Sequence, residues 1–171
     1  MATATYDLIA SQTLGSAAAS ITFSSIPSTY TDLRLVLTAT ATTSSGNVFL
    51  VLNGDSSALY SRTFILGQGT SATSSQATGQ PNFNLISNNG MIATYPSLYS
   101  VDMFSYTGST YKTVLYSSSE DENSGNANSS VSRAVGLYRS TNAITSLTLS
   151  TDTGINFAIG TTAQLYGIKS A

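Results

Sequence analysis

The chain of 171 residues contains no histidine, no cysteine and no tryptophan, and charged residues make up only 8% of it. Histidine and cysteine are the side chains that most readily supply proton transfer, nucleophilic attack and transition-metal binding. Their absence excludes Ser-His-Asp and Cys-His catalysis. Without cysteine there are no disulfides, so the fold must depend on its core, and the composition is compatible with assembly in a cytoplasm.

Positive charge is also sparse. The six Lys and Arg residues are scattered along the chain, and the net charge is −2. Nucleic-acid binding requires clustered basic residues that displace counterions, so we expect no nucleic-acid partner. No apolar run approaches the roughly 20 residues of a membrane helix, and the first residues lack the basic and apolar regions of a signal peptide. We therefore expect no membrane partner and no export through a signal peptide.

Apolar residues make up 41% of the chain, which is enough for a core. They alternate with serine and threonine at a period of two, the pattern of half-buried strands. This alternation predicts strands at Tyr6–Thr13, Ala19–Phe23, Leu33–Thr42, Val48–Leu52, Tyr60–Leu66, Phe83–Ile86, Ser100–Tyr106, Lys112–Ser118, Ser132–Tyr138, Ile144–Ser150 and Thr162–Ile168. About ten short strands without helices favour an all-β antiparallel β-sandwich, most simply a jelly roll, in a single domain over residues 1–171.

Turn signals separate the predicted strands. Asn53-Gly54 favours a tight hairpin because both residues tolerate positive φ. Gly108-Ser109 predicts a second hairpin, between two alternating runs. Residues 67–81 and 120–130 are long and polar, with little to bury, so we predict long loops there, and loops of that length are usually functional or mobile.

Two short motifs match enzyme patterns without the context those patterns need. Ser109-Thr-Tyr-Lys112 spans a predicted turn, whereas the serine–lysine motif opens a helix. Gly67-Gln-Gly69-Thr-Ser-Ala72 precedes no helix that could hold a dinucleotide. The aspartates are spread along the chain with nothing to pair them, so glycoside hydrolysis is a third and weakest hypothesis. We predict a non-enzymatic protein without a cofactor.

One dense group of oxygen ligands occurs in the sequence, at Glu120, Asp121, Glu122 and Asn123, with Asn126 and Asn128 following. Hard cations such as Ca²⁺ take carboxylate and amide oxygens from loops of this kind. The spacing does not fit the helix–loop–helix calcium motif, because Gly125 stands where a ligand belongs. The sequence therefore allows two interpretations of this segment, a cation-binding loop and a solvated acidic loop without a cation.

Tyrosine is the remaining candidate for recognition. Tyr95, Tyr99, Tyr106 and Tyr111, followed by Tyr116, fall in one stretch of the chain. Aromatic faces stack on sugars and anchor protein interfaces, so the first four are candidate interface or ligand contacts. The alternative is that they fill the core or its rim, since intermediate burial is normal for tyrosine.

Segments at both ends of the chain resemble small virion proteins of tailed bacteriophages. They are Tyr6–Leu14 (YDLIASQTL), Ser20–Leu33 (SITFSSIPSTYTDL), Val135–Leu149 (VGLYRSTNAITSLTL), Phe157–Thr161 (FAIGT) and Leu165–Lys169 (LYGIK). The resemblance covers roughly the outer halves of the chain and consists of strand patterns. It implies a structural protein, a capsid decoration (cement) protein or a tail or fibre component, and supplies no functional residues.

Resemblance and composition together give the leading hypothesis, a non-enzymatic virion protein that decorates or cements the capsid. Its expected partners are the major capsid protein or other virion proteins, and its expected location is the virion, assembled in the host cytoplasm. We also expect a closed homo-oligomer, a trimer if it occupies three-fold positions of the capsid. The alternative is a receptor- or glycan-binding module of a tail fibre or spike.

Overall fold

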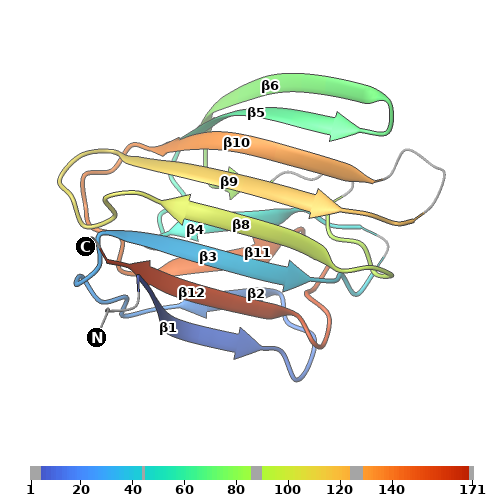
Figure 1. Ribbon diagram of the computed structural model, residues 1–171, viewed down its shortest axis with the longest axis horizontal. Helices are drawn as coiled ribbons and strands as arrows, with labels where there is room; N and C mark the ends of the chain where they lie inside the picture. The colour runs from blue at the N-terminus through green and yellow to red at the C-terminus, as the bar shows by residue number, and fades with distance from the viewer. Residues whose placement is uncertain (1–4, 44, 86–89, 124–128, 170–171) are drawn as a thin grey trace.

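The computed structural model describes residues 5–43, 45–85, 90–123 and 129–169. Twelve strands in these residues form two antiparallel sheets that share one core (Figure 1). The first sheet has eight strands, in the order β1 (Tyr6–Thr13), β12 (Thr162–Ile168), β3 (Asp32–Ala39), β8 (Ser97–Met103), β9 (Lys112–Glu120), β10 (Ser130–Tyr138), β5 (Tyr60–Gln68) and β6 (Ser71–Gln80). The second has four, in the order β2 (Ser20–Phe23), β11 (Leu147–Thr151), β4 (Val48–Leu52) and β7 (Phe83–Asn84). The predicted all-β antiparallel sandwich is confirmed.

Eight of these strands have the strand order of a jelly roll. β1, β12, β3 and β8 form half of the first sheet, and β2, β11, β4 and β7 form the second. Taken in chain order, the eight strands build two interlocked Greek keys. The other four strands are insertions: β5 and β6 come between β4 and β7, and β9 and β10 come between β8 and β11. All four insertions extend the first sheet beyond β8, as Figure 1 shows.

Period-two alternation explains which side chains reach the core. Leu33, Leu35 and Leu37 of β3 are fully buried, and their neighbours in sequence face outward. Leu147 and Leu149 of β11 do the same from the opposite sheet. Successive side chains of a strand point to opposite faces, so one apolar residue in two is enough to build each wall of the core.

Serine and threonine hydroxyls pair with one another between adjacent strands. Such pairs link β1 to β12, β2 to β11, β8 to β9 and β9 to β10; the residues are Thr13 and Thr162 (3.1 Å), Thr22 and Thr148 (3.1 Å), Ser100 and Ser117 (2.8 Å), and Ser118 and Ser132 (2.7 Å). A cross-strand hydroxyl pair satisfies two polar groups without any charge. This accounts for a sheet protein rich in serine and threonine and poor in ions.

An aromatic cluster fills the space beneath the inserted strands. Tyr60 stacks on Tyr138 with ring centroids 4.8 Å apart, Phe83 meets Tyr60 edge-on at 4.9 Å, and Phe83 lies 5.9 Å from Tyr116. Phe83 belongs to the second sheet, whereas the three tyrosines belong to β5, β10 and β9 of the first. Gly136 of β10 leaves room for the Phe83 ring, because a Cβ at that position would lie 2.4 Å from Phe83 Cε1.

The predicted loop at 67–81 is wrong. β5 continues to Gln68, Gly69 turns the chain with a φ of 52°, and β6 returns along β5 from Ser71 to Gln80. β6 lies at the edge of the sheet and is exposed on both faces over most of its length. A strand without a buried face needs no apolar alternation, so its sequence resembles that of a loop.

The predicted loop at 120–130 is shorter than expected. β9 reaches Glu120 and β10 begins at Ser130, which leaves residues 121–129 between them. Residues 124–128 lie outside the described residues. The two strands pair in one unbroken register up to these ends. The polar side chains there point to the inner face and bond across the strands, Ser118 with Ser132 and Glu120 with Ser130, so polar sequence continues both strands.

One predicted hairpin and one strand end also differ. Asn53 and Gly54 do form a tight turn with φ of 54° and 66°, but β4 and β5 lie in different sheets, so the turn joins the layers. The Asn53 side chain instead holds the segment that leads into β11, since its Oδ1 accepts a hydrogen bond from Thr145 N at 2.8 Å. β8 ends at Met103, whereas the sequence predicted that this strand continues to Tyr106. Ser105 has a φ of 48°, which is incompatible with an extended strand. The hairpin at Gly108-Ser109 is confirmed by the pairing of β8 with β9.

The described part of the chain contains no helix with the length and apolar character needed to cross a membrane.

The packing of Phe83 on Gly136 gives a stability prediction. Gly136→Ala should lower the free energy of unfolding by about 1–3 kcal/mol, because the added methyl overlaps the Phe83 ring in a packed core. The matched control is Gly15→Ala, where a Cβ would meet nothing within 4 Å, and it should change stability by less than about 0.5 kcal/mol. Urea denaturation measures both. Equal stabilities of the two variants would contradict the packing described here.

Candidate functional site

The four tyrosines predicted as contacts divide into two exposed and two buried. Tyr95 precedes β8 with 41% of its surface exposed, and Tyr111 precedes β9 with 55% exposed. Tyr99 points from β8 into the core, and Tyr106, just after β8, is also buried. The prediction that Tyr99 and Tyr106 contact a ligand or partner is therefore wrong, since their rings fill the sandwich.

Tyr106 has a clear structural role. Its hydroxyl donates a hydrogen bond to the Pro27 carbonyl and accepts one from Tyr30 N at 3.4 Å. These bonds fasten the turn after β8 to the segment that leads into β3. Burial raises the pKa of Tyr106, and the hydrogen bond from Tyr30 opposes that rise.

Other buried titratable groups lie on the inner face and also act structurally. Burial is the main cause that raises the pKa of Tyr60, Tyr116 and Tyr138. Burial also lowers the pKa of Lys112, whose Nζ donates hydrogen bonds to the carbonyls of Gly108 and Thr110. Lys112 thus closes the hairpin between β8 and β9 from inside.

Two of the three carboxylates of the proposed cation loop, those of Glu120 and Asp121, hold the chain locally, and Glu122 contributes its backbone N–H, which donates to Ser129 Oγ at 3.0 Å. Asp121 Oδ1 accepts hydrogen bonds from Asn123 N at 2.8 Å and from Ser129 Oγ at 3.1 Å. Glu120 is buried and accepts a hydrogen bond from Ser130 Oγ at 2.9 Å. Among the described residues, no three histidine, cysteine or acidic side chains gather where they could hold a metal ion. Asn126 and Asn128 lie outside the described residues, and Asp121 acts as the acceptor of a local turn.

The outward-facing side chains of the first sheet form three rows that cross all eight strands, and we call these rows the outer face. The first row is Thr13, Thr162, Thr38, Leu98, Ser119, Val131, Gly67 and Ala72. The second row is Ser11, Gln164, Val36, Ser100, Ser117, Arg133, Ile65 and Ser74. The third row is Leu8, Tyr166, Arg34, Asp102, Leu115, Val135, Thr63 and Gln76.

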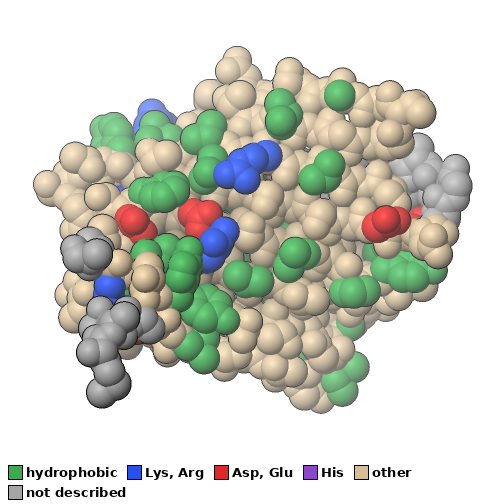
Figure 2. Space-filling model, in the orientation of Figure 1, with side chains coloured by type: hydrophobic (Ala, Val, Ile, Leu, Met, Phe, Trp, Pro, Cys, Tyr) green, Lys and Arg blue, Asp and Glu red, His purple; other side chains and the backbone are tan. Residues whose placement is uncertain are grey.

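The outer face carries almost no net charge. At neutral pH its first row has no charged side chain and the second has only Arg133. The third has only Arg34 and Asp102, which form an ion pair with Nε and Oδ1 3.2 Å apart. Figure 2 shows this side of the molecule, with apolar side chains spread over it and few charged groups between them. Ile65 and Val131 are 62% and 60% exposed on neighbouring strands. Large aliphatic side chains this exposed on one surface are typical of an interaction site.

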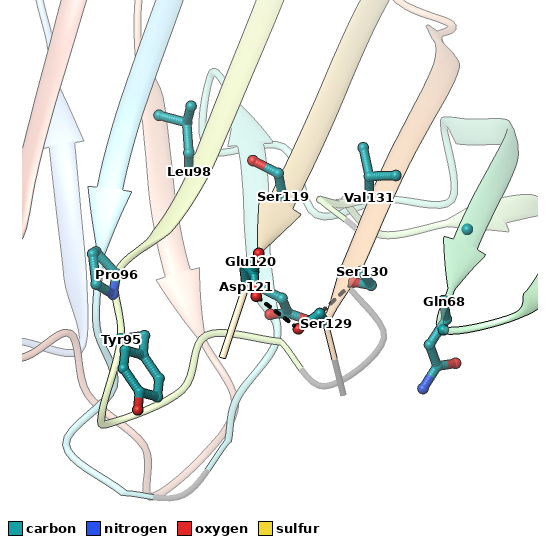
Figure 3. A pocket seen from close by; sticks show the side chains of 12 residues that line it. Gln68, Tyr95, Pro96, Leu98, Ser119, Glu120, Asp121, Ser129, Ser130 and Val131 are labelled. Atoms are coloured by element: carbon teal, nitrogen blue, oxygen red, sulfur yellow. Dashed lines mark hydrogen bonds between the residues drawn. The ribbon is translucent and has the colours of Figure 1, made fainter. Parts of the chain in front are cut away.

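Two shallow grooves of about 760 Å³ each hollow the outer face. They share Gly67 and Val131 and so lie side by side across β10, β5 and β6. The first, seen in Figure 3, runs from Tyr95 and Leu98 to Gln68 and has the hydrogen-bonding groups of Asp121 and Ser129 at one end. The second is lined by Ile65, Val131, Arg133 and the β6 residues Ala72, Thr73 and Ser74.

This arrangement offers contact surface, hydroxyls, amides and one exposed aromatic ring. Comparison of the chain with protein-family models, with curated proteins and with solved structures finds no match. The site must therefore be read from its own chemistry.

Sequence reasoning missed the outer face. Leu115, Val131, Val135 and Ile65 place apolar residues on the second face of strands whose first face is already buried, a pattern that indicates strands covered on both sides. Only the topology shows that nothing in the described residues covers this side. The sequence does place apolar residues on both faces of β5 and β10. Whether the second face is covered or exposed depends on the order of strands in the sheet, which the sequence does not show.

The buried tyrosines give a prediction of pH dependence. Above the ordinary tyrosine pKa of about 10, the unfolded chain loses phenol protons that the folded chain keeps, because burial raises the pKa of Tyr60 and Tyr116. The unfolded state then binds fewer protons, so the free energy of unfolding should fall by about 1.4 kcal/mol per pH unit for each such tyrosine. Lys112, with its lowered pKa, has the opposite effect below 10.5, so the fall is measured above that pH.

Thermal unfolding from pH 10.5 upward measures this slope. Tyr116→Phe should make it shallower than in the unsubstituted chain measured over the same pH range, because one phenol with a raised pKa is removed. An unchanged slope in Tyr116→Phe would show that the phenol does not titrate between the two states.

Proposed function

We propose that the chain is a non-enzymatic structural protein of a phage virion, which decorates or cements the capsid shell through the outer face of its eight-stranded sheet. The observation that carries the proposal is this broad, nearly uncharged surface with exposed Ile65, Val131, Leu98 and Val135. Monomeric proteins rarely leave aliphatic side chains so prominent across neighbouring strands.

The chemistry of the outer face suits docking against another protein. Burying aliphatic groups is favourable by about 25 cal/mol per Å² of apolar surface, and there are few charges to strip of water. The one ion pair, Arg34 with Asp102, is already neutralised within the face. Paired hydroxyls such as Ser100 and Ser117 need no partner from the neighbouring protein.

The resemblance of the terminal segments to small virion proteins of tailed phages supports placing this surface on a phage particle. The partners proposed for it are the major capsid protein or other virion proteins. A decoration protein must fold without cofactors and present a large contact area, and a sandwich extended by four inserted strands provides that area.

Substitution in the outer face tests the proposal. Ile65→Lys combined with Val131→Lys should weaken binding to purified shells of the source phage by at least about tenfold, because two desolvated charges replace central aliphatic contacts. Thr22→Lys, on the exposed face of the second sheet, is the control and should bind normally. Binding is measured by co-sedimentation, with circular dichroism to verify folding.

Electron microscopy of virions is a second test of the proposed location on the capsid. Density of this chain on the shell is the expected result. Its presence on the tail, or undiminished shell binding by the doubly substituted variant, would contradict the proposal.

A second function, glycan binding at a tail fibre or spike, is favoured by one observation. Tyr95 is exposed in the groove of Figure 3, together with Gln68, Asp121 and Ser129, so that an aromatic face lies near hydrogen-bonding groups. Sugars are bound by stacking on such a ring, with polar groups holding their hydroxyls.

Glycan-array binding distinguishes this alternative. If the groove binds a glycan, Tyr95→Ala should reduce binding by about tenfold or more, and Tyr111→Ala, at an exposed ring outside the groove, should not. Absence of binding by the unsubstituted chain, or equal loss in both variants, would eliminate it.

A further inference from the structure

We propose that two copies of this chain pair through β6, antiparallel across a two-fold axis, so that their eight-stranded sheets join into one continuous sheet. β6 is the last strand of its sheet, and within the described residues only β5 pairs with it. Its second side therefore presents unpaired backbone N–H and C=O groups, which are a template for another strand. This inference does not depend on the proposed virion role.

β6 is the least protected of the sheet edges, because its segment from Ser71 to Ala77 has none of the usual protections. Natural edge strands avoid pairing by being short, by bulges, by proline or by charge. β2 has four residues and β7 has two. β1 is interrupted by a bulge between Leu8 and Ala10, and it carries Asp7 in an ion pair with Lys169. β6 has ten residues, SATSSQATGQ, with neither charge nor proline.

The geometry of β6 leaves a straight segment for pairing. Its register with β5 runs unbroken from Ser71 to Ala77. The irregularity lies beyond this point, next to Gly79, which has a φ of 63°. The regular segment from Ser71 to Ala77, exposed on both faces over most of its length, can accept a partner strand along its free edge.

Symmetry favours a second copy as the partner. Antiparallel pairing about a two-fold axis brings β6 against itself, and an uncharged strand places no like charges opposite each other. Its serines and threonines would face one another across the new edge. The chain already uses such contacts between its own strands, at Thr13 with Thr162 and at Ser100 with Ser117.

A ring built through sheet edges would need a different contact. Each copy would have to offer β6 to the opposite edge of the next copy, which is β1 with its bulge and ion pair. The edges thus favour a two-fold dimer over the three-fold assembly expected from the sequence. The dimer would also extend the outer face, because Ala72 and Ser74 of β6 line the second groove.

Cysteine cross-linking locates the axis directly. The chain has no cysteine, so each single variant from Ser71→Cys to Ala77→Cys carries one thiol. Under mild oxidation, disulfide-linked dimers should peak at one position and fall away on either side, because only residues near the axis bring two Cβ atoms within about 4.5 Å. Ser11→Cys on β1 is the control and should remain uncross-linked. No dimer at any β6 position, or equal cross-linking at Ser11→Cys, would overturn the proposal.

Light scattering after size exclusion tests the same pairing without oxidation. The unsubstituted chain should have the mass of a dimer at about 100 µM. Ser74→Lys with Gln76→Lys should convert it to a monomer, raising the dissociation constant by at least about tenfold through like charges across the edge. The matched control is Ser11→Lys with Gln12→Lys on β1, which should stay dimeric.

Circular dichroism must show that both doubly substituted chains remain folded. A monomer or trimer mass for the unsubstituted chain, or a dimer that survives the β6 lysines, would refute the pairing. These outcomes are independent of capsid binding, so the proposed function and the dimer can fail separately.

Discussion

A four-stranded sheet faces an eight-stranded one, and this mismatch is the constraint on which the rest of the structure depends. Four of the eight strands, β9, β10, β5 and β6, are insertions beyond the jelly roll, and their inner face needs its own cover. The cluster of Tyr60, Phe83, Tyr116 and Tyr138 supplies much of it. Gly136 makes this possible, since any side chain there would displace the Phe83 ring. Rings buried in this cluster, Tyr116 among them, are unavailable for recognition.

The same extension creates the outer face. Every strand added to the first sheet adds one more outward side chain to each of three rows, and within the described residues no element covers them. Most polar side chains of this surface are uncharged hydroxyls and amides, some of them paired between strands, and the aliphatic residues Ile65 and Val131 are among its most exposed groups. A neutral surface with exposed aliphatic groups gains more from contact with another protein than from contact with water. Its continuation into an unprotected edge at β6 offers both a face and a side for assembly.

Much of the fold could be predicted from the sequence, and less of the site. Period-two alternation located eleven of the twelve strands, because most of those strands bury one face. β6 was missed since an edge strand exposed on both sides has no such signature. Of the four tyrosines predicted as contacts, Tyr95 and Tyr111 are exposed, whereas Tyr99 and Tyr106 are buried. Nothing local distinguishes these residues, because the burial of each depends on which face of its strand meets the opposite sheet.

The sequence by itself determined that the protein is built from strands and depends on neither histidine nor cysteine chemistry. Apolar residues at every second position lie on one face when the chain is an extended strand, so they are buried together in a sheet. Side chains that the sequence lacks cannot contribute to catalysis or metal binding. The tertiary structure alone decided that 67–81 forms a hairpin with β5, that the Asn53–Gly54 turn crosses between layers, and that Asp121 holds a turn. It also decided that no element in the described part of the chain covers the outer face of β5 and β10. Strand order depends on contacts between residues distant in sequence, and no local pattern records which strand will be an edge.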